Sequence, residues 1–353
     1  MASDALRGMD PEIAAARATS AKRDHGRMTI LDACKLFIES RKRDLGETSS
    51  TIAQYVTLKG KLIVWGERHG IEYVQGITPL HLERWYSSSA WSHYAPSTKA
   101  QRWSCVRTMF LFWEKRGVLE QSPAASIHRS KVDGDHVQGP YTDAQVADMF
   151  ANVESSMPRN LPIARRGNYA PRLRAFINLL LHTGADVSDA VLFEVSRIEA
   201  TMVDKRKVYV YRYKRLKTGV QAVIPISVAL AAELRDIPLE SGTTAEMPFR
   251  TDGLKLRHDQ EKWSKRVSAV LDAAGIEYVE LPTRDKRGQV QTKDANVKML
   301  RHTFAVRQLI AGQRPEELAR MMGHVDTKMI YLHYAPFVKA LDDAHIRRVV
   351  SVW

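Results

Sequence analysis

Residues able to take part in chemistry gather in one stretch near the C-terminus. Arg301, His302 and His324 can donate hydrogen bonds or carry positive charge, and Tyr331 and Tyr334 are candidate nucleophiles. The histidines are not spaced like a helical zinc pair such as HExxH, and no acidic pattern typical of a two-metal nuclease accompanies them. Without a metal, phosphodiester cleavage would use a tyrosine nucleophile and cationic donors that stabilise charge around phosphorus. Such a route, which would need neither a metal nor a nucleotide cofactor, is one use that this set of residues allows.

The overall charge favours a polyanionic partner. The 353 residues include 53 Lys and Arg against 40 Asp and Glu, which gives a formal charge of +13 and a pI of about 9.7. Nucleic acid is the commonest partner of so basic a chain, although a merely basic protein would show the same balance. We expect nucleic acid to be the partner.

Cysteine usage and hydropathy point to the cytoplasm. Cys34 and Cys105 lack a CxxC or CxxH neighbour, so they predict neither a disulfide framework nor a zinc site. The longest uninterrupted apolar stretch, around residues 176–181, is too short to span a bilayer. The N-terminal residues contain no apolar segment typical of a secretory signal. A cytoplasmic protein without a membrane partner is expected.

The elements that would position this chemistry divide into two domains. Residues 28–127 are predicted to form a compact unit of four helices, over residues 29–43, 49–70, 78–86 and 96–117. The last helix carries Val106, Met109, Phe110 and Trp113 at helical spacing, which predicts a buried face. Basic side chains beside these faces are candidates for phosphate contacts: Lys59, Lys61, Lys99, Arg102 and Arg107.

A second domain is expected over residues 141–340. Residues 128–140 are rich in charge and small residues and predict a linker, while residues 1–27 and 341–353 are expected to be tails. Thr142 and Gln145 have the spacing of a capping box, which predicts a helix start. A long helix through residues 175–182 follows, and then two β-prone runs on either side of a KTG turn at residues 217–219. The remainder is predicted to be helical.

Three strings in the C-terminal stretch resemble the signature of the tyrosine recombinase family. KMLRHTFA is similar to its HxxRH box, MMGH to its (L/M)GH box, and IYLHYAPF to the segment that carries its nucleophilic tyrosine. The SPAASI and YTDAQV strings are similar to the family's domain junction, so the resemblance spans residues 28–340. It implies a mainly α fold with a small antiparallel sheet, in which a helical SAM-like core-binding domain precedes an α+β catalytic domain.

The resemblance also implies catalytic roles. Arg301 matches an arginine that clamps a non-bridging oxygen of the scissile phosphate, and His324 matches a residue that donates a hydrogen bond to the same phosphate. Lys217 matches the lysine that protonates the leaving 5′ oxygen, with Lys214 as a nearby rival. The expected nucleophile is Tyr334.

Tyr331 is the alternative nucleophile. An ungapped match to the family places Tyr334, in HYAP, at the nucleophile's position. Tyr331 would need a two-residue deletion, although its YLHY setting is similar to the YxH string of other members. The tyrosine that is not the nucleophile is expected to pack.

The sequence departs from the family at two positions. Lys298 replaces the histidine of HxxR, and this change keeps a cationic donor. Asp186 replaces the first catalytic arginine in the string TGADVSD. A carboxylate about 4 Å from a phosphate oxygen would repel it by roughly 4 kcal/mol at an effective dielectric near 20. Asp186 could turn away, Arg172 or Arg174 could reach into the site, or catalysis could be reduced.

These observations leave three functional hypotheses. The resemblance implies a site-specific recombinase or integrase that works through a 3′-phosphotyrosyl intermediate, as a homo- or hetero-tetramer on DNA whose C-terminal segments pack onto neighbours. Asp186 instead favours a DNA-binding accessory protein with impaired catalysis. A type IB topoisomerase-like enzyme would share similar catalytic groups, but the N-terminal helices resemble the integrase type.

Overall fold

The computed structural model describes residues 26–46, 49–125, 137–285 and 287–350. The chain forms two compact units, Met1–Gly134 and Asp135–Trp353. The expected tail before residue 26, most of the expected linker and residues 351–353 lie outside the described residues. Within the described ranges, no helix combines the length and the apolar character that crossing a membrane requires.

The first unit is a helical bundle around a core rich in tryptophan. Its elements are α2 (Ile30–Leu45), α3 (Ser50–Arg68), η1 (Val74–Gly76), α4 (Pro79–Ser87), α5 (Ser89–Ser92) and α6 (Pro96–Lys115). The four expected helices correspond to α2, α3, α4 and α6, and the short α5 is additional. Trp85 and Trp91 pack edge to face with ring centroids 5.1 Å apart, and both are fully buried. Leu31 and Val56, which were expected on apolar faces, are instead 40% and 46% exposed.

The second unit contains more strand than the sequence predicts. Its helical elements are α7 (Asp143–Ala151), α8 (Ile163–Thr183), α9 (Val187–Val191), η2 (Val195–Arg197), α10 (Val228–Arg235), α11 (Leu256–Ala273), α12 (Lys298–Ile310), α13 (Pro315–Met321) and α14 (Lys328–Val350). The strands are β1 (Ile198–Val203), β2 (Arg206–Lys214), β3 (Gln221–Ile226), β4 (Tyr278–Arg284) and β5 (Val290–Asp294). They form an antiparallel sheet β1–β2–β3 and a separate β4–β5 hairpin. The mainly α class with small antiparallel sheets is thus confirmed, but β1 and the β4–β5 hairpin were not expected.

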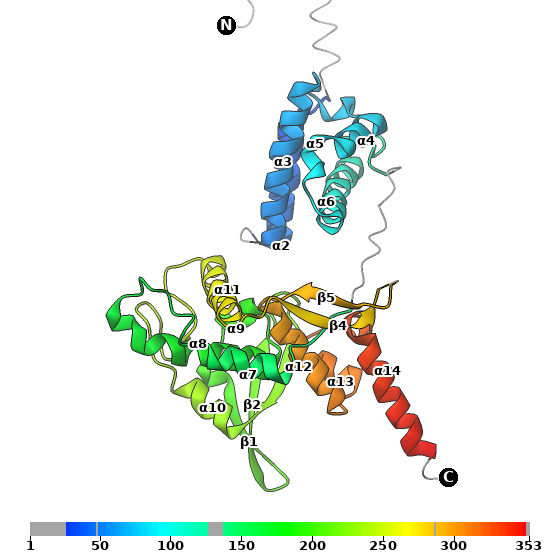
Figure 1. The fold of residues 1–353 in the computed structure, drawn as a ribbon. Helices are drawn as coiled ribbons and strands as arrows, with labels where there is room; N and C mark the ends of the chain where they lie inside the picture. The colour runs from blue at the N-terminus through cyan, green and yellow to red at the C-terminus, as the bar shows by residue number, and fades with distance from the viewer. Residues whose placement is uncertain (1–25, 47–48, 126–136, 286, 351–353) are drawn as a thin grey trace, which may run out of the picture. The chain divides into compact units, whose positions relative to one another are not determined.

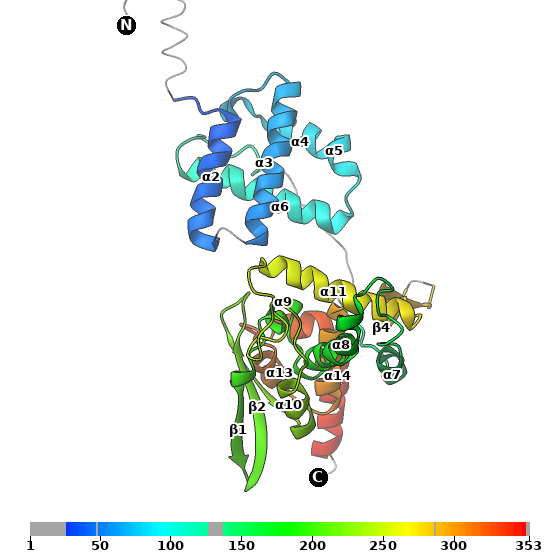
Figure 2. The same cartoon turned by 90° about the vertical axis from the view of Figure 1, so that its left-hand side faces the viewer.

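Helix α8 lies at the centre of this unit and packs against α12. Its Phe176 is fully buried and stacks on Trp263 of α11, with ring centroids 4.4 Å apart. The β1–β2 hairpin projects from the helices, and α14 extends to the C-terminal end of the unit (Figures 1 and 2). Residues 341–350, which were expected to form part of a tail, are the last turns of α14. Residues 137–140, expected in the linker, belong to the second unit, where the Gln138 N–H donates to the His333 carbonyl at 3.0 Å.

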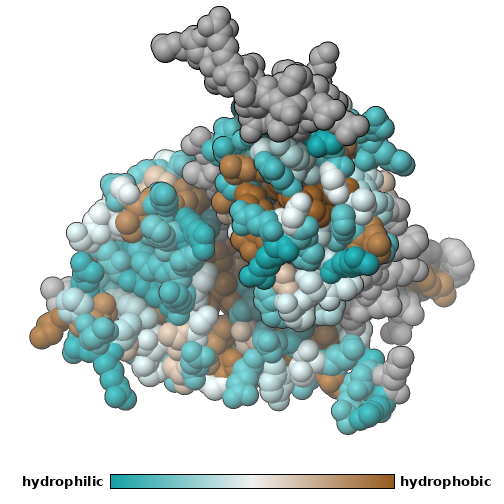
Figure 3. Space-filling model, turned by 90° about the horizontal axis from the view of Figure 1, so that it is seen from above, coloured by the Kyte–Doolittle hydropathy of each residue, from teal (hydrophilic) through white to brown (hydrophobic). Residues whose placement is uncertain are grey.

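The surface of the chain is largely polar on the face seen in Figure 3. Hydrophilic side chains cover most of that face, and smaller hydrophobic patches lie between them.

Candidate active site

One buried guanidinium brings together three segments of the second unit. Arg301 lies in the first turn of α12 and is 5% exposed. It donates to the carbonyl of Gly184 at the end of α8, to the Met322 carbonyl at 3.1 Å, and to Nε2 of His324 at 2.8 Å. Because three different segments hold this side chain, its orientation is fixed before any ligand binds.

Two glycines allow these segments to approach closely. Gly184 has a φ of 61°, and a Cβ there would lie 2.3 Å from the ring of Phe304 on α12. Gly323 has a φ of 63°, and a Cβ there would lie 3.1 Å from Cδ of Arg215. Glycine is the residue that fits both a left-handed backbone and such close contact. The glycines of the TG and GH strings therefore allow the segments of this site to pack closely.

His324 is uncharged in this arrangement. Burial, and then the nearby charges of Arg301 and Arg215, lower the pKa of His324 to about 3. Since Arg301 donates to Nε2, the imidazole proton must be on Nδ1. Within the described residues, Nδ1 is a buried donor without a hydrogen-bond partner. The site thus contains a histidine that is held in one tautomer by an arginine.

Tyr334 lies at a break in α14 and points into the same region. Its φ of −127° and ψ of 19° are not helical. The side chain is 1% exposed, and its hydroxyl lies 2.6 Å from Nδ1 of His302 on α12. Burial raises the pKa of Tyr334 well above its usual value, and the charge of Arg301 opposes this effect. Tyr331, in contrast, is 47% exposed.

His302 is a buried neutral base beside that hydroxyl. It is 4% exposed, and burial followed by the charge of Lys298 lowers its pKa to about 3. Lys298 itself is exposed at the first position of α12. A neutral imidazole has one ring nitrogen that can accept a hydrogen bond, so His302 can accept the proton of a neighbouring phenol.

The turn that carries Lys217 is attached to the His324 segment. Lys217 is exposed between β2 and β3, and the hydroxyl of the next residue, Thr218, donates to the Gly323 carbonyl at 3.0 Å. The charge of Lys217 is among the causes that lower the pKa of His324. Lys214 is the exposed last residue of β2. The structure thus places Lys217 within electrostatic reach of His324.

Asp186 faces an arginine that sequence analysis did not single out. Its Oδ1 accepts from the Val187 N–H at 2.9 Å at the start of α9, and its Oδ2 lies 3.3 Å from Nη2 of Arg215. Arg215 also places Nε 3.5 Å from Oδ2 of Asp189. Asp186, which the resemblance matches to the family's first arginine, is therefore a carboxylate paired with a guanidinium from the β2–β3 turn.

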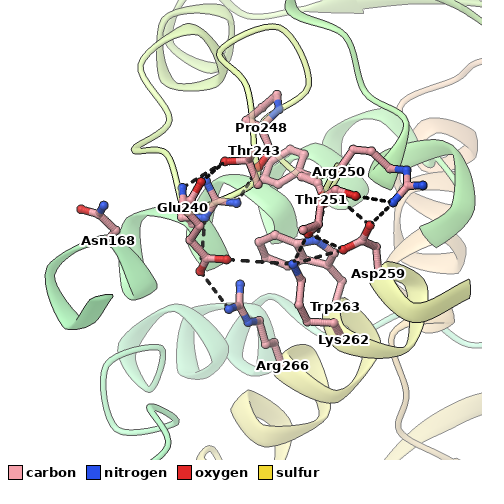
Figure 4. A network of polar contacts seen from close by, with 12 residues as sticks. Asn168, Glu240, Thr243, Pro248, Arg250, Thr251, Asp259, Lys262, Trp263 and Arg266 are labelled. Atoms are coloured by element: carbon pink, nitrogen blue, oxygen red, sulfur yellow. Dashed lines mark hydrogen bonds and ion pairs between the residues drawn. The ribbon is translucent and has the colours of Figure 1, made fainter. Parts of the chain in front are cut away.

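Neither arginine proposed from the sequence as a replacement reaches the site. Arg172 is fully buried, and its two Nη atoms donate to the carbonyls of Pro238 and Pro248, both at 2.5 Å. Its Nε lies 3.6 Å from Glu240, in the network shown in Figure 4. Arg174 donates to Glu154 at 2.8 Å. Both side chains have structural partners of their own, so of the alternatives that the sequence left open, the one in which Arg172 or Arg174 reaches into the site is excluded in this structure.

Glu240 and its neighbours form a polar network that supports α11. Arg266 on α11 donates to Glu240 at 2.8 Å, and Lys262 lies 3.2 Å from Asp259 (Figure 4). Asp259, which is fully buried, also accepts from the Thr251 N–H at 3.0 Å. This network anchors the segment between α10 and α11 and contains no group assigned to the reaction.

Across the described ranges, no group of three or more His, Cys, Asp or Glu side chains is arranged to hold a metal ion. The polar groups around Tyr334 are instead nitrogen donors and acceptors: Arg301, His302, His324 and, farther out, Lys217. Such a set can bind an anion and move protons.

Comparison with known proteins identifies the family. The profile of the phage integrase family matches residues 153–338, which include every site residue described above. The chain belongs to the phage integrase family. Tyrosine recombinase XerC of Xanthomonas campestris pv. campestris is 25% identical over 346 residues, covering 96% of this chain and 96% of that protein. Tyrosine recombinase XerC of Roseiflexus castenholzii is 26% identical over 248 residues, covering 68% of this chain and 69% of that protein.

Solved structures of integrases share the fold of this integrase-family chain. A lambda integrase dimer bound to a COC′ core site has a TM-score of 0.61 at 15% identity, covering 94% of this chain and 82% of that chain. A lambda integrase tetramer bound to a Holliday junction has a TM-score of 0.59 at 16% identity, covering 92% of this chain and 84% of that chain. The fold class expected from the sequence is confirmed.

Two side chains of the site were not assigned roles from the sequence. His302 is adjacent to Arg301, and its sequence signal was its place in the RH pair. Arg215 stands two residues before Lys217, but nothing in that spacing indicates Asp186 as its partner. Its pairing depends on the packing of the β2–β3 turn against the start of α9.

Proposed function

We propose that this chain is a site-specific DNA recombinase that cuts and rejoins DNA through a 3′-phosphotyrosyl intermediate at Tyr334. The observation that carries the proposal is the 2.6 Å contact between the Tyr334 hydroxyl and His302, on the helix that also carries Arg301. A nucleophile, a proton acceptor and a phosphate-binding guanidinium thereby meet in one place. Membership of the phage integrase family supports this assignment.

Side chains of the site can accept and supply both protons that the proposed reaction moves. The Tyr334 oxygen attacks phosphorus while its proton passes to Nδ1 of His302. The bond from phosphorus to the 5′ oxygen breaks, and Lys217 supplies the proton that makes this oxygen a hydroxyl. Rejoining reverses both transfers, so the phosphotyrosyl bond conserves the energy needed for religation.

Charge on the phosphorane is stabilised by preorganised donors. Arg301 has five N–H groups, and the three contacts described above leave others available for a non-bridging oxygen. A phosphate oxygen that displaced Nε2 of His324 from Arg301 would place the ring beside the same phosphate. Lys298 adds an exposed cation near His302. Each such donor contributes roughly 10²–10³ in rate.

The buried position of Tyr334 requires α14 to move before DNA is cut. The hydroxyl is covered, since the side chain is 1% exposed. The non-helical backbone at Tyr334 interrupts the hydrogen-bond pattern of α14 and is the point at which the helix can bend. Docking of the phosphate on Arg301 would then bring it into line with the hydroxyl.

We assign DNA positioning to residues 28–127 and catalysis to residues 141–340. In the first unit, cations gather on two tyrosine rings: Lys99 lies 3.9 Å from the ring centroid of Tyr86, and Lys61 and Arg102 lie 5.1 Å and 4.3 Å from that of Tyr94. Such a cluster suits phosphate contacts that fix the position of a protein on DNA. The DNA complexes of lambda integrase, a dimer on a core site and a tetramer on a Holliday junction, support a homo- or hetero-tetramer on double-stranded DNA.

A second candidate function rests on Asp186. Its carboxylate occupies the position of a phosphate-binding arginine, which favours a DNA-binding accessory protein without cleavage activity. Covalent trapping separates the two functions. The full chain first selects its half-site from a random duplex library, and a nicked suicide duplex carrying that half-site is then offered to it.

We expect the wild-type chain to form a covalent protein–DNA adduct. If the wild type forms none while Asp186→Arg does, the accessory function would be supported and the present chain would be a recombinase with a decayed site. If both the wild type and Asp186→Arg bind the duplex stably but neither forms an adduct, the proposed strand cleavage through Tyr334 would be overturned.

A further inference from the structure

The Arg215 side chain contacts Asp186, the residue that stands where the resemblance expects a phosphate-binding arginine. It follows β2 directly, is 7% exposed and precedes Lys217 by two residues. Its guanidinium contacts Asp186, the residue that replaces the family's first arginine, at 3.3 Å. The β2–β3 turn therefore places a positive charge beside the carboxylate at the start of α9.

Two carboxylates hold this guanidinium from one side. Its Nε lies 3.5 Å from Asp189, which is 4% exposed and whose other oxygen accepts from the Leu216 N–H at 2.9 Å. Asp186 is the more open partner, with 39% of its side chain exposed against 2% for Asp189. Together the two acidic residues orient Arg215 in the way that buried carboxylates orient functional side chains.

The stem of Arg215 lies against the segment that carries His324. Its Cδ would be 3.1 Å from a Cβ built on Gly323, so the chain passes directly beside the GH turn. Its charge is also the first one after burial that lowers the pKa of Arg301, and it contributes to the lowered pKa of His324. The positive charge of Arg215 thus acts on the buried guanidinium of Arg301, and an anion bound between the two side chains would relieve this repulsion.

We propose that Arg215 performs the phosphate-contacting function of the missing arginine, by donating to a non-bridging oxygen of the scissile phosphate while Asp186 and Asp189 orient it. This inference rests on the proposed recombinase function. It explains why Asp186 need not abolish cleavage, because its charge is matched by Arg215 at 3.3 Å. The alternative is that Arg215 is only an ion-pair partner that keeps α9 in place.

The decisive variant is Arg215→Gln, with Arg212→Gln as its matched control. Arg212 lies in β2, the strand that Arg215 follows, and pairs with Glu199 at 3.0 Å, with 42% of its side chain exposed. Adduct formation is timed on the nicked suicide duplex with either a normal scissile phosphate or a methylphosphonate. The methyl group removes the negative charge that an arginine would neutralise.

We expect Arg215→Gln to slow cleavage of the phosphate by roughly 10²–10³-fold, as removal of one oxyanion donor does. On the methylphosphonate it should cleave at nearly the wild-type rate. Arg212→Gln should match the wild type on both substrates. An equal loss on both substrates would show a purely structural residue, and no loss on the phosphate would show no role; either result overturns the proposal.

A binding measurement keeps this inference separate from the proposed function. Orthovanadate, a tetrahedral oxyanion that resembles phosphate and can take a fifth oxygen ligand, is titrated into the full chain by calorimetry. The wild type and Arg212→Gln should bind it at least about tenfold more tightly than Arg215→Gln. If the wild type cleaves no DNA but still binds vanadate more tightly than Arg215→Gln, the recombinase proposal fails while the assignment of Arg215 to an anion site is supported. Equal affinities, or no binding by the wild type, would overturn the assignment of Arg215.

Discussion

The hydroxyl of Tyr334 lies 2.6 Å from Nδ1 of His302, and both side chains are almost completely buried. A tyrosine hydroxyl loses its proton with difficulty in such surroundings, since burial raises its pKa. Contact with a neutral imidazole provides an acceptor at the moment of attack. The HxxR position carries Lys298, a cation, so His302 is the histidine that can take this proton.

Replacement of His302 by glutamine should impair cleavage rather than DNA binding. The amide keeps a polar group near Tyr334 but does not accept a proton, and loss of general-base catalysis typically costs roughly 10²–10⁴-fold in rate. Single-turnover adduct formation on the nicked duplex measures the change. His182→Gln, an exposed position on α8, should leave the rate unchanged. A rate within twofold of the wild type in His302→Gln would exclude it as the proton acceptor.

The same histidine should make the second unit less stable in acid. The pKa of His302 is about 3 in the fold, against 6.5 when it is exposed, so between these values the unfolded state binds more protons. Unfolding free energy therefore decreases as the pH falls below 6.5, by up to about 1.4 kcal/mol per pH unit for each such histidine.

Hydrogen exchange of the α12 amides tests this dependence. Between pH 7.5 and 5.5, after correction for intrinsic exchange rates, the wild type should lose more protection in α12 than His302→Gln. The expected difference in the free energy of opening is about 1.4 kcal/mol, because the unfolded His302 takes up a proton over this pH range and the folded one does not. Equal losses in the two proteins would contradict a neutral buried His302.

The leaving-group role of Lys217 can be tested by chemical rescue. Lys217→Ala should slow cleavage of a normal duplex by roughly 10²–10⁴-fold, because the 5′ oxygen then leaves without a proton. A duplex with sulfur in place of that bridging oxygen should restore the rate, because a thiolate needs no proton to leave. Lys214→Ala, at the end of β2, is the control and should be unaffected. If Lys214→Ala is instead the slow variant whose rate the sulfur substitution restores, Lys214 and not Lys217 protonates the leaving oxygen.

Arg172 should matter for stability and not for the reaction. Arg172→Met would leave the Pro238 and Pro248 carbonyls and part of Glu240 without their partner in a buried network. Breaking such a network costs about 3–5 kcal/mol. Arg174→Met removes an ion pair at the surface and should cost less than about 1 kcal/mol. Denaturant unfolding followed by circular dichroism compares the two. An Arg172→Met protein as stable as Arg174→Met would contradict the role of the network.

The site could be predicted from the sequence where local strings determine it. Arg301, His324 and Tyr334 belong to short strings near the C-terminus, and the capping box at Thr142 correctly marks the start of α7. Helical periodicity also contains a signal for Arg172. It falls on the same face of α8 as Tyr169 and Phe176, which indicates burial and not a free cation.

Other features depend on contacts between residues far apart in the chain. The pairing of Arg215 with Asp186 joins positions separated by 29 residues through the packing of a turn on α9, and no periodicity encodes it. The β4–β5 hairpin was missed because its second strand, VQTKD, is short and polar and has no apolar alternation. The exposure of Leu31 and Val56 reflects which part of each helix the bundle covers, and the sequence alone does not define that.

Mapping the residue that becomes linked to DNA tests the assignment of Tyr334 as the nucleophile. The wild-type chain is trapped on the nicked duplex, digested with protease and nuclease, and analysed by tandem mass spectrometry. We expect a nucleotide 3′-phosphate on Tyr334 and no adduct in Tyr334→Phe, while Tyr331→Phe still reacts. A modified Tyr331, or an adduct that persists in Tyr334→Phe, would contradict this assignment.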